Sequence, residues 1–278
     1  MNWIVLSIFA GIASSAFSAI NRIALKDKGD STAYGWWFEV VRSIFFITIV
    51  LRNPFPELDL SSLTKLILVS FSEMFSVYVF MRMHALTELS VSSIISRLRI
   101  VWSPIIAWLV INERLTSVEY LGIIIIFLGI AIVSSPSEIK KDKGIKFALL
   151  FSFSSALLST LVKNASVNLS SEIIILSQGI VPIILLPILM KSRFQRIWDS
   201  ASNNLFNILL AGSFNIASSY LLVEALRLTE ASKVVGIYQA MTILSVIYGI
   251  FVLKEKDKMY RKIIGTIIVI LGIILTVV

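Results

Sequence analysis

Five ionisable side chains stand inside long apolar runs of this sequence. Glu39 and Arg42 lie one helical turn apart, Glu73 lies in the next apolar run, and Arg97 and Arg99 lie in the run after that. An ionisable group at the centre of a bilayer costs at least about 2.5 to 3.5 kcal/mol, so it must face protein or water. We therefore expect these residues to pair with one another or to bind a polar solute in a shared cavity.

A polar stripe runs along the same apolar segment as the two adjacent arginines. Its members recur at spacings of four and three residues, which places them on one face of a helix: Ser92, Ser96, Arg99 and Ser103. Such a stripe predicts the wall of a cavity. Arg97 points about 200° away from Arg99 on a regular helix, and we expect it to pair with Glu73. A buried ion-pair lock of these residues, with no solute contact, stays open as an alternative.

The elements that must position these residues are predicted from the apolar runs. Of the 278 residues, 57% are hydrophobic and only 15% are charged, whereas about a quarter of the residues in a soluble protein are charged. A helix that crosses a bilayer needs about 20 apolar residues. Ten such runs are present, at about 3–24, 33–51, 63–84, 91–111, 118–135, 145–163, 172–190, 204–226, 233–253 and 260–277. The sequence therefore predicts an all-α integral membrane protein with ten transmembrane helices.

The residue types that are missing exclude several functions. There is no cysteine and one histidine, so we expect no disulfide framework and no metal site. No phosphate loop or catalytic triad is visible, and we expect neither an enzyme nor a cofactor. The Lys and Arg residues behind the net charge of +8 lie mostly in short connections. There they report topology, so no nucleic-acid partner is expected.

An internal repeat divides the chain into two halves. Leu86–Ser90 (LTELS) recurs as Leu228–Ser232 (LTEAS), 142 residues later, and Glu113 recurs as Glu255 at the same offset. The glycine pair of the fifth run recurs in the tenth. We therefore predict two five-helix repeats, residues 1–138 and 139–278. Because five is odd, the second repeat enters the membrane in the opposite direction. Inverted repeats place a substrate site near the bilayer midplane and permit alternating access.

The second half keeps polarity at the matching positions but loses charge. Asn215 stands 142 residues after Glu73, and Gln239 stands 142 residues after Arg97. A polar stripe on the ninth run consists of Tyr238, Thr242 and Ser245. We expect a cavity with one charged wall and one neutral wall. Hydrogen bonding between helices by these hydroxyl groups stays open as an alternative.

The motifs at the end of the first half resemble a known family. Ser103-Pro104, Glu113-Arg114-Leu115-Thr116, Gly122 and Gly129 are similar to the fourth and fifth helices of EamA-type carriers of the drug/metabolite transporter (DMT) superfamily. Arg42 resembles the arginine of that family's second helix. The second copy departs from the pattern, with Val246 in place of the proline and Lys256 in place of the arginine. The resemblance implies ten helices in two inverted repeats, and export or exchange of small metabolites.

These observations favour a secondary transporter in the cell (inner) membrane. The five core charges have a formal balance of +1, which favours an anionic or zwitterionic metabolite such as an amino acid or organic acid. Glu73, Glu39 and Arg42 are the candidates for coupling a proton; a counter-substrate and a homodimer stay open. Export of drugs or organic cations is the first alternative and needs Glu73 free of arginine beside aromatic residues. A non-transporting subunit or receptor is the second and predicts no accessible central cavity.

The basic residues predict the orientation of the chain. Sixteen Lys and Arg residues lie in odd-numbered connections between the expected helices, and six lie in even-numbered ones. The positive-inside rule then puts the odd-numbered connections in the cytoplasm and both termini outside. EamA-type carriers usually resemble the reverse. Because the chain has no cysteine, Ser137→Cys and Val278→Cys can each be treated with a membrane-impermeant maleimide on intact cells. We expect labelling at position 278 and not at 137; labelling at 137 alone would contradict the charge rule here.

Overall fold

The computed structural model describes residues 2–25, 30–52, 58–86, 95–133, 144–241 and 259–277. These residues form ten helices: α1 Trp3–Leu25, α2 Ser31–Val50, α3 Leu60–Leu86, α5 Arg99–Ile111, α6 Ser117–Val133, α7 Ile145–Ala165, α8 Ser171–Ile188, α9 Arg193–Leu228, α10 Ala231–Ala240 and α12 Met259–Val277. They follow the ten predicted runs in order. No strand occurs among the described residues. The predicted all-α architecture is confirmed.

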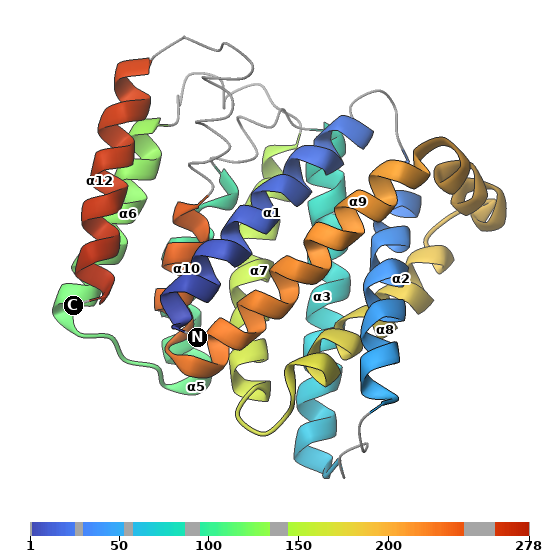
Figure 1. The fold of residues 1–278 in the computed structure, drawn as a ribbon, viewed down its shortest axis with the longest axis horizontal. Coiled ribbons are helices and arrows are strands. Elements are labelled where there is room, and N and C mark those ends of the chain that lie inside the picture. Colours follow the sequence, from blue (N-terminus) through green and yellow to red (C-terminus); the bar gives the residue numbers. More distant parts are fainter. Residues whose placement is uncertain are drawn as a thin grey trace.

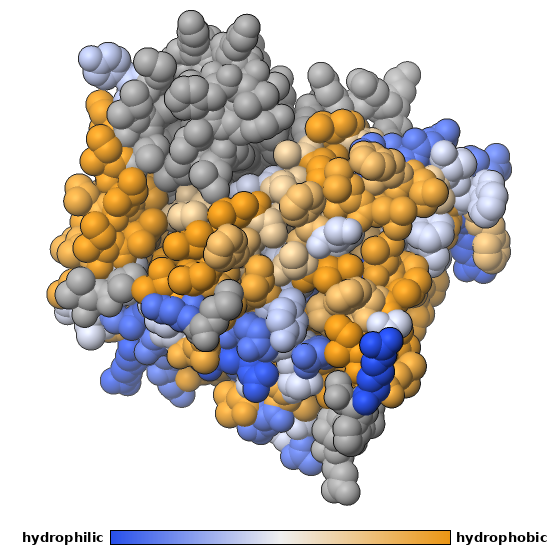
Figure 2. Space-filling model, in the orientation of Figure 1, coloured by the Kyte–Doolittle hydropathy of each residue, from blue (hydrophilic) through white to orange (hydrophobic). Residues whose placement is uncertain are grey.

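The helices have the length and surface of a membrane protein. Six of them, α1, α2, α3, α7, α8 and α9, are long and apolar enough to cross a bilayer, and α5, α6 and α12 contain shorter apolar stretches. Large apolar side chains such as Phe71, Ile184 and Leu271 are exposed. Figure 2 shows apolar residues over the middle of one face and hydrophilic residues toward its lower edge and upper right. An apolar belt between polar ends is the surface that a bilayer requires.

The helices of the two halves pack against one another in matched pairs. α1 packs on α9 and α3 on α7, α3 packs on α8 and α9 on α2, and α5 packs on α7 and α10 on α1. Exchanging the halves turns each of these contacts into its counterpart. α6 and α12 form a separate pair at one edge of the molecule (Figure 1).

Two helices differ from their predicted ranges. In place of one continuous fourth helix over 91–111, the described part has a turn at Arg97 and Leu98, and α5 begins at Arg99. The eighth helix is longer than predicted, because α9 begins at Arg193 and bends at Asn204, where φ is −135° and ψ is 19°. The segment before Asn204 carries several charged residues, so hydropathy alone does not detect it.

A charged contact fixes the bent end of α9 to the start of α2. Asp30 is the N-cap of α2 and accepts hydrogen bonds from the amides of Thr32 and Ala33. The guanidinium of Arg196 donates to both oxygens of the same carboxylate, at 2.5 and 2.9 Å. Burial alone raises the pKa of Asp30, but the Arg196 and amide hydrogen bonds outweigh it and lower that pKa. The contact joins the first and fourth odd-numbered connections on one side of the molecule.

Glycines let α6 and α12 approach to backbone contact. A Cβ atom on Gly122 would lie 2.7 Å from Thr276 Cγ2 and 2.9 Å from the carbonyl oxygen of Gly272. A Cβ atom on Gly272 would in turn lie 2.7 Å from the amide nitrogen of Ile126. Such distances are too short for any side chain. In membranes, where lipid is as apolar as the helices, close backbone approach is a main source of helix association.

We predict that Gly122→Ala destabilises the protein by about 1 to 3 kcal/mol, because the added methyl group meets backbone atoms that cannot rotate away. Gly236→Ala in α10 is the matched control. Its Cβ atom would lie 3.6 Å from Ile126 Cδ1, an ordinary contact. Thermal unfolding of the purified proteins in one detergent measures both. Equal melting temperatures for the two variants would show that the α6–α12 contact adds little to stability.

Candidate functional site

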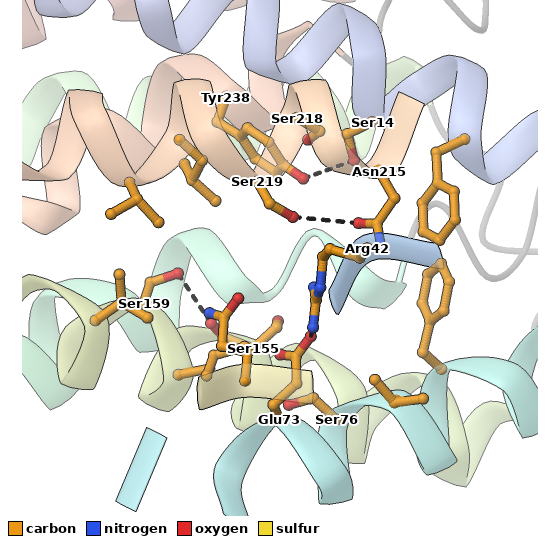
Figure 3. Close-up of a pocket in the computed structure, with 18 of the residues that line it drawn as sticks. Ser14, Arg42, Glu73, Ser76, Ser155, Ser159, Asn215, Ser218, Ser219 and Tyr238 are labelled. Atoms are coloured by element: carbon orange, nitrogen blue, oxygen red, sulfur yellow. Dashed lines mark hydrogen bonds and ion pairs between the residues drawn. The ribbon is translucent and has the colours of Figure 1, made fainter. Parts of the chain in front are cut away.

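A cavity of about 140 Å³ lies between the two halves. Eight helices line it, and the lining residues are Ser14, Phe17, Phe38, Arg42, Glu73, Ser76, Val77, Phe80, Arg99, Phe151, Ser155, Leu158, Ser159, Val162, Gln178, Asn215, Ser218, Ser219, Leu222, Val223, Leu226 and Tyr238. Figure 3 shows side chains from α1, α9 and α10 facing those from α3 and α7 across the space. A polar cavity inside an apolar bundle is a binding-site candidate.

Arg42 holds two carboxylates at one side of the cavity. Its Nη2 atom donates to Glu39 Oε2 at 2.5 Å and to Glu73 Oε1 at 2.9 Å. Figure 3 shows the contact with Glu73 between α2 and α3. The expectation that Arg97 pairs with Glu73 is therefore wrong. The reason is local: Glu39 and Arg42, one turn apart on α2, face α3 at the depth of Glu73.

Arg99 is the second arginine of the cavity. Its Nη2 atom donates to Ser159 Oγ, and its guanidinium lies over the ring of Tyr238, 5.3 Å from the ring centroid. It makes no ion pair with the described residues. Both contacts are with uncharged groups, so the positive charge of Arg99 is not neutralised by a carboxylate in direct contact. A buried guanidinium of this kind can bind a carboxylate in bidentate geometry.

The polar stripe predicted around Arg99 is not the cavity wall. Of its described members, Arg99 alone lines the cavity; Ser103 is fully buried elsewhere and Ser96 is partly buried. Arg97 is also buried outside the lining. The turn at Arg97 and Leu98 changes the helical phase, so spacings that assume one regular helix fail across it. Ser92 lies outside the described residues.

The second half supplies an uncharged wall. Asn215 and Tyr238 line it as predicted, whereas Gln239 is buried without lining it. The Tyr238 hydroxyl donates to Ser14 Oγ at 2.6 Å, and Ser219 Oγ donates to Asn215 Oδ1 at 3.2 Å. Every charged residue among the described lining comes from the first half. The predicted charge asymmetry is present, and Thr242 and Ser245 lie outside the described residues.

Sequence reasoning missed several polar residues of the lining. Ser155 and Ser159 on α7 were interpreted as packing residues, and Gln178 on α8 was not considered; all three line the cavity. A signal was available in the repeat. Residues 73, 76, 77 and 80 on α3 line the cavity, and so do residues 215, 218, 219 and 222 on α9, each 142 positions later. Extending the Glu73 stripe by helical spacing and then by the repeat offset would have found Ser76, Ser218 and Ser219.

Phenylalanines form one end of the cavity. The ring of Phe17 packs edge-on against Phe38, with centroids 5.3 Å apart, and stacks on Phe80 at 5.8 Å. Phe80 in turn contacts Phe151 at 4.8 Å. All four rings line the cavity. A solute in this space therefore meets charged and hydroxyl groups along the middle and an apolar surface at this end.

Hydrogen bonds tie the helix ends of the two halves together beyond the opposite end of the cavity. The carboxylate of Glu113, after α5, accepts from the amides of Ala231 and Ser232 at 2.8 and 3.0 Å and so caps α10. Lys163 at the end of α7 donates to the carbonyl oxygens of Leu226 and Thr229, each at 2.7 Å. The interpretation of Glu113 as a folding residue agrees with this contact.

Fold and cavity together define a multi-pass membrane protein with a central polar site. The family model for the EamA-like transporter family matches residues 1–135 and 142–278. The chain belongs to this family, which is part of the DMT superfamily, and the predicted resemblance is confirmed.

Relatives agree with this assignment. The chain is similar to two proteins of Archaeoglobus fulgidus, both named uncharacterized transporters. One is 27% identical, covering 99% of this chain and 98% of the relative; the other is 23% identical, covering 98% and 96%. A solved crystal structure is similar in fold, with a TM-score of 0.69 and 12% identity over 98% of this chain and 95% of that one. The protein is a transporter.

We predict that Arg42→Met destabilises the fold by about 3 to 5 kcal/mol, because it leaves buried carboxylates without their cation. Adding Glu73→Gln to Arg42→Met should restore part of the loss by removing one of those charges. The melting temperatures of the three proteins measure the effect. If Arg42→Met melts at the wild-type temperature, the cluster around Arg42 is not needed for stability.

Proposed function

We propose that the protein is a secondary transporter of a small anionic or zwitterionic metabolite, such as an amino acid or organic acid, in the cell (inner) membrane. The observation that carries the proposal is Arg99: a buried guanidinium that lines the cavity and contacts only uncharged groups among the described residues. A substrate carboxylate there would gain charge-assisted hydrogen bonds that no protein group supplies.

Glu73 gives the proposal its zwitterionic form. Its carboxylate lines the same cavity as Arg99, so a molecule with both a carboxylate and an ammonium group could contact both residues. The phenylalanines at one end suit the carbon skeleton of such a molecule. Hydroxyl and amide groups of Ser155, Asn215 and Tyr238 complete the site we propose for the substrate. Arg97, Ser96, Ser103 and Gln239, by contrast, would act behind it.

The repeat supports a mechanism of alternating access. The symmetric helix contacts and the matched lining positions on α3 and α9 fit two inverted five-helix repeats, residues 1–138 and 139–278. In such an arrangement the halves rock around a fixed central site and expose it to one side at a time. The cavity lined by both halves is the site that this motion would carry.

The two alternatives fit the geometry less well. Export of organic cations needs Glu73 free of arginine, but Glu73 is bonded to Arg42. The tryptophans Trp36 and Trp37 point their indole nitrogens at carbonyl oxygens of Ile183 and Ile197 and are not in the cavity lining. A non-transporting subunit predicts no central cavity, and one is present.

We predict that Arg99→Ala lowers uptake of the transported substrate by about ten- to a hundredfold, the effect of losing one charged hydrogen-bonded contact, while the protein remains folded. Counterflow into proteoliposomes with radiolabelled L-amino acids and dicarboxylic acids measures uptake. Arg193→Ala, an exposed arginine at the start of α9, is the control and should transport normally. Wild-type uptake by Arg99→Ala would exclude Arg99 from the substrate site.

A further inference from the structure

The cluster around Arg42 carries more negative than positive charge. Glu39 and Glu73 both accept from the same Arg42 nitrogen, and all three side chains are buried. With both carboxylates ionised, the cluster holds one uncompensated negative charge inside the membrane. Such a charge is strongly unfavourable there. The cluster should therefore be occupied either by a proton or by the positive group of a bound solute.

The helices packed against α2 supply no second cation to this cluster. Facing it, α3 contributes Glu73, α8 contributes the Gln178 amide and the backbone at Gly179, and α9 contributes the Asn215 amide. The charged group across the cavity is Arg99, which is bonded to Ser159. Tyr238 and Tyr220 are the nearby phenols: Tyr238 donates to Ser14, and the Tyr220 ring stacks on Phe46. Among these described groups, none neutralises the excess charge.

Glu39 is the residue at which a proton fits. Its side chain is fully buried and is not part of the cavity lining. Its Oε2 atom contacts Arg42, but its Oε1 atom has no hydrogen-bond partner among the described residues. The backbone of α8 lies close by, since a Cβ atom on Gly179 would be 3.6 Å from Glu39 Oε2. An unsolvated carboxylate oxygen without a donor is costly, whereas a protonated one is neutral.

We propose that Glu39 binds a proton that exchanges with the ammonium group of a zwitterionic substrate at Glu73, which makes the protein a proton/substrate antiporter. The inference rests on the proposed function. With Glu39 protonated, Arg42 and Glu73 form a neutral pair. When an ammonium group binds Glu73, it supplies the missing positive charge, and Glu39 releases its proton from Oε1 to water. Proton and substrate thus neutralise the same excess charge, and their binding is mutually exclusive.

The protonation of Glu39 is tested without transport. Infrared spectra of purified wild-type protein at neutral pH should contain the C=O stretch of a protonated carboxylic acid that is absent from Glu39→Gln. The exposed-site control Asp199→Asn should keep the band. Glu39→Asp is the second variant if Glu39→Gln does not fold, and it should shift the band. A band that is unchanged in the available Glu39 variant, or absent from wild type, overturns the proton site whether or not the protein transports anything.

The exchange is tested in proteoliposomes with a mixture of radiolabelled L-amino acids. An interior more acidic than the exterior should raise wild-type accumulation at least severalfold. Glu39→Gln should retain counterflow exchange but lose the response to the pH gradient, and Asp199→Asn should behave as wild type. Uptake by wild type that ignores the gradient overturns the coupling. A complete lack of amino-acid uptake by wild type overturns the zwitterion exchange and the amino-acid form of the proposed function, while the infrared result still decides the proton site.

Discussion

The need to compensate every charge inside the bilayer shapes this molecule more than any other constraint. Arg42 provides the compensation by bonding Glu39 on its own helix and Glu73 on α3. Without such a partner, each carboxylate would carry its full desolvation cost. The contact joins α2 to α3 beside the cavity and fixes Glu73 in the lining. The chemistry of the site therefore follows from an interaction that the membrane itself demands.

The two halves divide the work of forming the cavity. The first half supplies both arginines and the carboxylate of the lining, and the second half supplies hydroxyl and amide groups. Matching positions on α3 and α9 line the same space, so the backbone geometry is shared although the side chains differ. At one such pair, Glu73 corresponds to Asn215. Replacing charge by a neutral polar group on one side avoids a second buried charge, whose compensation would need another partner.

Hydropathy and the repeat predicted the helices well, because crossing a bilayer requires long apolar runs and internally bonded backbone. The glycine contacts of α6 and α12 followed from the same reasoning, since small residues at matching positions indicate close helix packing. Side-chain partners were harder to predict. The pairing of Glu73 depended on the rotation of α2 against α3, and the role of Arg97 depended on a turn that interrupts the helix before Arg99. Neither rotation nor interruption leaves a periodic signal in the sequence.

The placement of bonds suits a motion of one half against the other. The buried ion pairs, from Arg42 to Glu39 and Glu73, lie within the first half. Across the cavity the described side-chain bonds are of another kind: Arg99 donates to Ser159, and Tyr238 donates to Ser14. Hydroxyl groups can exchange such bonds with water or with a solute at little net cost, whereas separating a buried ion pair leaves charges exposed to a medium of low dielectric constant. The halves can thus change partners at the cavity while the costly charge pairing moves with the first half as a unit.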